Sequence, residues 1–327
     1  MDSEEEAMLR TTVAEITRND DGAQLTSALD QFGWPDMLAT NPGLAVPAVF
    51  QGQGVAGTWS SAFHDVLSSA VEVDPNTVVL IPWPGSNHTG VRGASTIQIN
   101  GIISGGRPNP SNALVSVGEQ DRSSTLIGVP MSELTVRNVN GLDPELSTSL
   151  VTGSISYQAK GEDAGDLSRW DCALANGRWA LSHQLIGLMD AMQMLALSHA
   201  LERSQFGRQI GSFQAIRHRL AEAHVATEAA RSAAYAARPF GHPSWERFDA
   251  SMASELAKLI SGRSAIKVTA HCQQVLAGIG FTSDHPFHRF MKRAVVLERM
   301  LGDAEQLAES VGRRLAVLGE APRVIDL

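Results

Sequence analysis

The chain has 327 residues, 43% of them hydrophobic and 19% charged, and its formal net charge is −9. This length is enough for two or three packed units, and the composition excludes a disordered or fibrous protein. The acidic charge disfavours nucleic acid as a partner. The sequence has no apolar run long enough to span a membrane, and its N-terminus is acidic where a signal peptide would be basic and then apolar. We therefore predict a cytoplasmic protein with no membrane partner.

Residues 1–75 are predicted to form several short helices, which together make an N-terminal helical domain. The segment 3–18 opens with a serine and three glutamates, as is typical of a helix N-terminus. The segment 26–39 contains a helix that ends or bends at Gly33-Trp34-Pro35. Residues 46–70 carry apolar side chains at helical spacing, although glycines interrupt them.

Residues 76–165 are predicted to form a β-domain. Short segments rich in Val, Ile and Thr alternate with Gly, Pro, Asn and Asp, and no stretch between them has a helical period. This spacing favours an antiparallel sheet or a small barrel. The glycines between Gly101 and Gly106 are interpreted as turns, because they do not form a dinucleotide fingerprint between a strand and a helix.

Residues 166–327 are predicted to form a four-helix antiparallel bundle. The expected helices cover residues 178–205, 212–238, 243–278 and 285–318, and the first of them has apolar residues every three or four positions. The alanine-rich stretch 229–237 suits close packing against another subunit. The chain as a whole is therefore predicted to be α+β, with helices, a β-domain and a helical bundle in that order.

Two joints between the predicted bundle helices combine glycine with cationic, aromatic and amide side chains. The first joint, residues 203–214, reads "RSQFGRQIGSFQ", and the second, residues 274–282, reads "QVLAGIGFT". A guanidinium can donate a forked pair of hydrogen bonds to a phosphate, and an aromatic ring offers a packing face. Glycines allow the backbone to turn and to approach a ligand closely.

These joints resemble two motifs of the acyl-CoA dehydrogenases, a family of flavoproteins. The first is similar to R-x-x-F-G-x-x-I-x-x-F-Q, and the second to Q-x-x-G-G-x-G-[YF]-T. The resemblance implies an acyl-CoA dehydrogenase-like fold, FAD as the cofactor, and a bundle whose joints hold the FAD of a neighbouring subunit. The residues that it assigns to FAD binding are Arg203, Phe206, Gly207, Ile210, Phe213, Gln214, Gln274, Gly278 and Gly280.

The same resemblance locates the catalytic base, a carboxylate that removes the proton beside the thioester carbonyl. In most members the base is a Glu followed by Gly, and this chain has Leu301 there, followed by Gly302. In other members the base lies on the first bundle helix, where this chain has Gly177. Neither residue accepts a proton, so no catalytic residue is predicted. The nearby carboxylates are Glu298, Glu305 and Asp303, of which Asp303 is the weak candidate for a displaced base.

The flavin-contacting segments of the family's β-domain are also reduced. Of T-E-P-x-x-G-S-D only Pro84-Gly85-Ser86 remains, and of W-I-[ST]-N-[GA] only Asn100-Gly101. The chain therefore resembles the short subunit of heteromeric α2β2 acyl-CoA dehydrogenases of actinobacterial steroid side-chain breakdown. In those enzymes two unlike chains share one FAD site.

This resemblance implies a subunit that completes the FAD site without supplying the base. The partners that it implies are a second dehydrogenase-like chain, an acyl-CoA substrate such as a steroid side-chain CoA ester, and an electron-transfer flavoprotein as acceptor. Two alternatives stay open. One is a self-sufficient homo-oligomer with a displaced base, and the other is a structural subunit without flavin.

No metal site is predicted. Cys172 and Cys272 lack partners at metal-ligand spacing and are interpreted as buried thiols. His218, His224 and His271 lie on predicted helices without a full set of ligands, and are interpreted as packing or surface residues.

Overall fold

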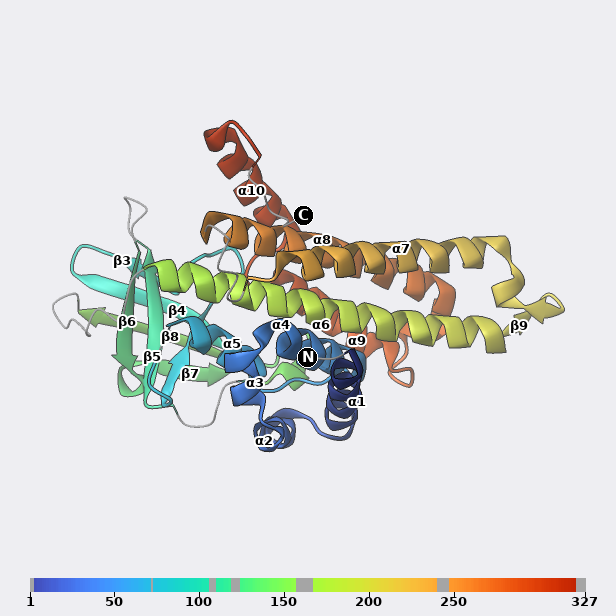
Figure 1. Ribbon diagram of the computed structural model, residues 1–327, viewed down its shortest axis with the longest axis horizontal. Helices are drawn as coiled ribbons and strands as arrows, with labels where there is room; N and C mark the ends of the chain where they lie inside the picture. The colour runs from blue at the N-terminus through green and yellow to red at the C-terminus, as the bar shows by residue number, and fades with distance from the viewer. Residues whose placement is uncertain are drawn as a thin grey trace.

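The computed structural model describes residues 3–71, 73–105, 110–118, 124–156, 167–239 and 247–321. A β-sheet lies at one end of a bundle of long helices, and short N-terminal helices pack along one side of the bundle (Figure 1). The prediction of an α+β chain with N-terminal helices, a middle sheet and C-terminal helices is confirmed.

Five short helices precede the sheet, as predicted. They are α1 (Ser3–Asn19), α2 (Gly22–Phe32), α3 (Trp34–Thr40), α4 (Pro42–Ala56) and α5 (Ala62–Val71). The bend expected at Gly33-Trp34-Pro35 separates α2 from α3, because Gly33 has a φ of 94° and Pro35 stands at the start of the next helix.

Helix α4 crosses the first bundle helix, α6 (Leu167–Glu202), at two glycines. A Cβ on Gly54 would overlap the carbonyl oxygen of Gln184, and a Cβ on Gly187 would overlap that of Gln51. The two backbones therefore pack directly against each other. This contact explains Gly54, one of the glycines that interrupt the apolar pattern of residues 46–70.

The middle region forms one eight-stranded sheet with the path β1-β5-β3-β4-β8-β7, in which β2 also pairs with β4 and β6 with β5. The strands are β1 (Thr77–Val79), β2 (Ile81–Pro82), β3 (Gly90–Arg92), β4 (Thr96–Ile103), β5 (Asn112–Gly118), β6 (Ser124–Pro130), β7 (Thr135–Asn138) and β8 (Ser149–Ser156). The prediction of a wholly antiparallel sheet is wrong at two pairs. Strand β5 runs parallel to both β1 and β3, because the chain crosses over between them instead of returning through a hairpin.

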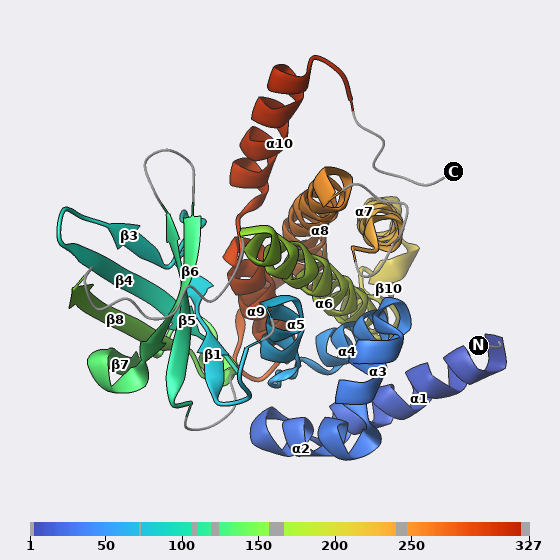
Figure 2. The same cartoon turned by 60° about the vertical axis from the view of Figure 1, so that its left-hand side comes forward.

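The described residues of the C-terminal region, 167–239 and 247–321, form five helices instead of the four that were predicted. They are α6, α7 (Gln214–Ala237), α8 (Arg247–Leu276), α9 (Phe287–Arg299) and α10 (Ala304–Leu318). Helices α6, α7, α8 and α9 lie together, whereas α10 points away from them (Figure 2).

The expected single helix over residues 285–318 breaks at Leu301 and Gly302, whose φ angles are 57° and 104°. Asp303 then starts α10 as its N-cap, accepting hydrogen bonds from the backbone N–H groups of Glu305 and Gln306, while Gln306 completes a capping box. A glycine followed by a capping aspartate is a signal for a helix end and a new start. The apolar period of residues 285–318 concealed this signal.

One hydrophobic core joins the N-terminal helices, the C-terminal helices and the near edge of the sheet, and the sheet has a second core of its own. Arg293 of α9 lies at the junction of the three regions. Its guanidinium donates to the carbonyl of Gly57 at 2.6 Å and to the carboxylate of Asp143, with Nε to Oδ2 at 2.6 Å. This buried side chain of α9 therefore links a helix that follows the sheet in the sequence to the end of α4, which precedes it, and to the loop between β7 and β8.

Candidate functional site

The first joint of the bundle is a small β-hairpin that projects beyond the ends of α6 and α7 (Figure 1). Its strands, β9 (Ser204–Gln205) and β10 (Arg208–Gln209), are antiparallel. Phe206 and Gly207 form the two-residue turn, with φ angles of 54° and 76°. Positive φ at both turn residues is the geometry that best matches the twist of a hairpin.

Phe206 stands out because it combines backbone strain with exposure. A residue other than glycine in the left-handed region costs about 1–2 kcal/mol, and the Phe206 side chain is 92% exposed. A strained, exposed aromatic residue contributes little to the folding of its own chain. The side chain is therefore available to pack on something outside the chain.

The other residues expected in this joint divide into exposed and packed ones. Arg203 and Gln214 are exposed, and no hydrogen bond or ion pair within the described ranges engages the Arg203 guanidinium. Ile210 and Phe213 are half-buried, and the Ile210 N–H donates to the Arg203 carbonyl at 2.8 Å. The polar groups and the Phe206 ring thus point outward from a base that Ile210 and Phe213 hold.

The second joint is a 3-10 segment, η4 (Ala277–Phe281), between α8 and α9. Gln274 is exposed, and a Cβ on Gly278 would meet no atom within 4 Å, so this backbone is open. Gly280 is buried instead, and a Cβ there would lie 2.6 Å from Nε2 of Gln273. Gly278 therefore leaves room for a ligand, whereas Gly280 leaves room for a neighbouring side chain.

The first joint and the start of α9 lie at the same end of the bundle. Burial lowers the pKa of His199, near the end of α6, and the charges of His285 and Arg203 lower it further. Phe281 of the second joint is 74% exposed. This end of the molecule thus presents a guanidinium, amides and exposed aromatic rings, which fit an anionic, flat dinucleotide such as FAD.

The two expected positions of the catalytic base lie against each other in the interior. A Cβ on Gly177 of α6 would lie 2.7 Å from a side-chain methyl of Leu301 and 2.7 Å from one of Leu67. Leu301, Leu67 and Gly177 are all buried. Apolar atoms therefore fill the place where a carboxylate would have to meet a substrate.

The nearby carboxylates have structural roles. Asp303 caps α10, as described above, and Oε1 of the buried Glu298 accepts from the Ala304 N–H at 2.9 Å. Glu305 is exposed in the first turn of α10. Asp303 thus has a structural role as a helix cap, and the atoms nearest to a Cβ on Gly177 are apolar carbons of Leu301, Leu67 and Phe63.

Buried cations hold the turn at Leu301. Lys258 donates from Nζ to the carbonyls of Glu298 at 2.7 Å and Gly302 at 3.3 Å, and Arg178 donates from Nε to the carbonyl of Leu301 at 3.0 Å. Burial lowers the pKa of Lys258 to about 7. Arg178 also pairs with Glu255, which Arg314 contacts from its other side. The turn therefore keeps a fixed, strained shape although it carries no base.

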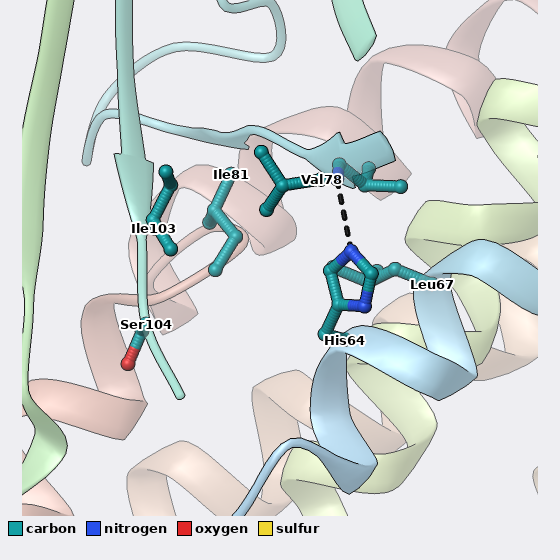
Figure 3. Close-up of a pocket in the computed structure, with 7 residues that line it drawn as sticks. His64, Leu67, Val78, Ile81, Ile103 and Ser104 are labelled. Atoms are coloured by element: carbon teal, nitrogen blue, oxygen red, sulfur yellow. Dashed lines mark hydrogen bonds between the residues drawn. The ribbon is translucent and has the colours of Figure 1, made fainter. Parts of the chain in front are cut away.

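A small pocket lies beside this contact, between α5 and the edge of the sheet (Figure 3). It is lined by His64, Leu67, Val78, Val79, Ile81, Ile103 and Ser104. The ring of His64 accepts a hydrogen bond at Nε2 from the Val79 N–H at 3.1 Å. The space between these side chains leaves a cavity volume of about 0 Å³ for even a water-sized molecule, far below the roughly 300–1,000 Å³ of small-molecule sites. The flavin ring and an acyl thioester do not fit here.

The residual Pro84-Gly85-Ser86 segment is exposed. A Cβ on Gly85 would lie 3.4 Å from Nε2 of Gln306 in α10, and Trp170 of α6 donates to the carbonyl of Asn87 at 3.2 Å. The segment therefore lies at the surface beside α6 and α10.

The described residues contain no group of three or more His, Cys, Asp and Glu side chains placed to hold a metal ion. Cys272 is buried, and burial raises the pKa of its thiol to about 12. The prediction of a buried thiol is wrong for Cys172, which is exposed near the start of α6. None of the described helices is both long and apolar enough to cross a lipid bilayer.

Two solved structures overlay on nearly the whole chain. The ChsE4-ChsE5 complex from Mycobacterium tuberculosis matches with a TM-score of 0.75 and 17% identity, over 99% of this chain and 99% of the solved one. A variant of the Tcur3481-Tcur3483 steroid ACAD matches with a TM-score of 0.75 and 19% identity, over 97% and 99%. In sequence, residues 170–316 match the family model described as acyl-CoA dehydrogenase, C-terminal domain.

The chain has the acyl-CoA dehydrogenase fold. Members of the acyl-CoA dehydrogenase family are FAD-dependent flavoproteins. Among curated relatives, the probable acyl-CoA dehydrogenase FadE25 of Mycobacterium tuberculosis is 27% identical over 186 residues, which are 56% of this chain and 43% of the relative. The chain spans less than half the length of the curated acyl-CoA dehydrogenases that it matches.

Sequence reasoning missed Arg208, which stands at an unspecified position of the acyl-CoA dehydrogenase motif. Its guanidinium carbon lies 4.2 Å from the centre of the Phe213 ring. The buried side chains of Lys258 and Arg178 were also missed. The apolar pattern of their helices gives no sign of the backbone carbonyls to which they donate hydrogen bonds.

Proposed function

We propose that this chain is a subunit of an FAD-dependent acyl-CoA dehydrogenase complex. In this complex the chain completes a flavin site that lies mainly on a second, unlike chain. The reaction of the complex is the α,β-dehydrogenation of an acyl-CoA thioester. The partner chain supplies the catalytic base, and this chain supplies binding groups at the end of its helical bundle.

The observation that carries the proposal is the hairpin at the end of α6. Phe206 is held in a strained conformation and is almost fully exposed, and the Arg203 guanidinium beside it makes no hydrogen bond or ion pair with the described residues. The Phe206 ring contacts the edge of the hairpin base at Phe213, but most of its surface packs on nothing in this chain. The strained turn and the exposed groups have a physical reason if a nucleotide held by another chain packs on them.

The closed interior supports the assignment of the base to the partner. The contact of Leu301 with Gly177 fills the place of the base, and the pocket beside it is too small for a substrate. An alternative with a displaced base at Asp303 would require that carboxylate to leave the N-terminus of α10, which it caps.

When bound, FAD supplies the acceptor for the hydride that leaves the acyl chain. The residues of this chain bind and orient it. Arg203 would hold the pyrophosphate through a charge-assisted pair of hydrogen bonds, Phe206 would pack on the flat base, and the amides of Gln214 and Gln274 would donate to polar edges. Gly207 and Gly278 let the backbone approach the nucleotide.

The substrate class in this proposal is a bulky acyl-CoA, with steroid side-chain CoA esters as the first candidates. The support is the likeness in fold to the Tcur3481-Tcur3483 steroid ACAD. Loss of one catalytic site leaves space in a shared site for a larger acyl group. An electron-transfer flavoprotein is the proposed acceptor of the electrons, and the cytoplasm the proposed location.

The experiment is to purify the chain alone and after co-expression with candidate acyl-CoA dehydrogenase chains from the same genome. We expect a colourless chain alone and a yellow, active complex. In that complex Arg203→Met and Phe206→Gly should each lose flavin at least tenfold more readily than the parent, whereas Arg313→Met, on the exposed face of α10, should retain it.

Phe206→Gly sharpens this test, because it removes the strain along with the ring. We expect the free energy of unfolding of the lone chain to rise by no more than about 1 kcal/mol, because the freedom that glycine has in the unfolded chain offsets part of the relieved strain. A yellow and active lone chain would instead support a self-sufficient enzyme, and a colourless complex would support a structural subunit.

A further inference from the structure

The hairpin of residues 204–209 needs support from outside its own strands. Each strand pairs through only two residues, and every residue from Leu201 to Gln209 is exposed. An isolated two-stranded hairpin is at best marginally stable in water, and the turn also holds Phe206 in the left-handed region.

Arg208 provides a contact between the hairpin and the start of α7. Its guanidinium carbon lies 4.2 Å from the centre of the Phe213 ring, within the range of a cation–π interaction. Phe213 is the N-cap residue of α7, so it is anchored to a long helix. The same ring contacts Phe206 edge to face, with 6.3 Å between the ring centres. Phe213 therefore lies between the second strand of the hairpin and the tip of its turn.

Backbone bonds at the base of the hairpin fix where it leaves the bundle. Ile210 donates to the carbonyl of Arg203 at 2.8 Å, and the Ser212 hydroxyl donates to the carbonyl of Gln209 at 2.7 Å. Arg217 donates from Nε to the carbonyl of Gly211 at 2.9 Å. These bonds orient the base but do not reach the turn. The ring of Phe213 and the guanidinium of Arg208 extend the support toward the tip.

The two arginines of the hairpin are in different situations. Arg208 is stacked on Phe213, whereas the Arg203 guanidinium makes no hydrogen bond or ion pair with the described residues. One guanidinium is engaged within the chain and the other is available to a phosphate.

We propose that Arg208 is a positioning residue: its stacking on Phe213 holds the hairpin in the shape that presents Arg203 and Phe206 before any nucleotide binds. The role of the presented residues rests on the proposed function, but the stacking and its effect on the hairpin do not. A preformed hairpin loses less conformational freedom on binding, so it binds more tightly than a flexible one would.

The test begins with amide hydrogen exchange of the purified lone chain, followed by mass spectrometry of peptides covering residues 203–213. Arg208→Met keeps the alkyl stem and removes the charge, and it should speed exchange in these peptides about two- to fivefold, as an exposed cation–π contact would. Phe213→Leu should speed exchange at least as much, because it also removes the contact with Phe206, and combining the two substitutions should add nothing to the effect of Phe213→Leu. Arg208→Lys should restore part of the protection.

Arg313→Met is the matched control, because Arg313 is exposed on α10 in a pair with Glu309. It should leave exchange in residues 203–213 unchanged. Unchanged exchange in Arg208→Met, or full additivity with Phe213→Leu, would overturn the proposal. This part of the test needs no flavin and no partner, so its outcome is independent of the proposed function.

A second measurement separates positioning from direct binding of phosphate. In the flavin-containing complex, the dissociation constant of FAD is measured over a range of salt concentrations. Arg208→Met should raise the dissociation constant about two- to fivefold at every salt concentration. Arg203→Met should also make the dissociation constant less dependent on salt, because the variant lacks the charged contact with phosphate that salt would screen. A flattened dependence in Arg208→Met would make Arg208 a phosphate ligand and contradict the proposal. A complex without flavin would refute the proposed function and leave the exchange result standing.

Discussion

Some buried polar side chains in this protein contribute to the stability of the fold, and His183 is one of them. The buried His183 of α6 packs edge to face against Trp179 and Tyr235 and bonds to Gln51 at 2.9 Å. Burial, assisted by the charges of nearby arginines, lowers the pKa of His183 to about 3. The ring is therefore neutral in the folded chain at any ordinary pH, and its role is to pack the crossing of α4, α6 and α7.

This histidine makes stability depend on pH. The folded-state pKa lies below the unfolded value of about 6.5, so between these values only the unfolded chain takes up the proton. Stability is full above pH 6.5 and falls as the pH drops toward 3, by about 1.4 kcal/mol per pH unit. We expect His183→Gln to reduce the stability difference between pH 7 and pH 5 by roughly 2 kcal/mol.

Denaturant unfolding at the two pH values measures this difference. His218→Gln, on the exposed face of α7, serves as the control and should leave the difference as it is in the parent. If His183→Gln and the parent lost equal stability between pH 7 and pH 5, the assignment of a neutral buried ring would be wrong.

At the scale of elements, glycines decide how closely helices approach. Gly54 and Gly187 let α4 and α6 cross with their backbones in contact. Gly312 lies in the middle of α10, where a Cβ would meet no atom within 4 Å. The same substitution should therefore have opposite effects at the two places.

We expect Gly54→Ala to lower the thermal midpoint strongly or to prevent folding, because the methyl group would displace the α6 backbone. Gly312→Ala should stabilise the chain by up to about 1 kcal/mol, since alanine is the better helix former. Thermal unfolding followed by circular dichroism measures both. A Gly54→Ala variant as stable as the parent would show that the two helices do not touch as described.

Helices and their boundaries could be predicted from the sequence where apolar residues recur with a helical period or where glycine and proline interrupt that period. The helical period of residues 178–205 predicted the long helix α6, and Gly33-Trp34-Pro35 predicted the boundary between α2 and α3. The sequence does not reveal which strands pair, so the parallel neighbours of β5 were missed. The break at Leu301 was missed because apolar periodicity continues across it.

For the site, the motif predicted which residues gather at the end of the bundle, but not how they are exposed or held. Nothing in the letters of residues 203–214 distinguishes the exposed Arg203 from the stacked Arg208. The roles of the two arginines become distinct only in the structure, where the left-handed turn brings Arg208 onto the ring of Phe213. The assignment of the FAD-binding residues and the division into three domains, 1–75, 76–165 and 166–327, stay predictions.

On the scale of the whole molecule, the three regions are tied by charge as well as by a shared core. Arg293 contacts Asp143 and the carbonyl of Gly57 in the interior. Its neighbour Arg289 forms a more exposed pair with Glu145. Removal of the buried cation leaves the Asp143 carboxylate without its counter-ion, away from water.

We therefore expect Arg293→Met to lower the free energy of unfolding by about 3–5 kcal/mol, as is typical when one partner of a buried pair is lost. Arg289→Met, the surface counterpart, should cost less than about 1 kcal/mol. Chemical denaturation of both variants gives the comparison. Equal effects would mean that the junction is not held by the buried pair.

The central claim concerns how many flavin sites two chains make. This chain presents exposed binding groups at one end, and Leu301 and Leu67 fill the space beside Gly177 in its interior. We propose that the chain contributes to one flavin site and forms no second site of its own. The direct measurement is the ratio of FAD, from absorbance of the released flavin, to protein in the purified complex. One FAD per pair of unlike chains is the predicted result, and one FAD per chain would contradict the account.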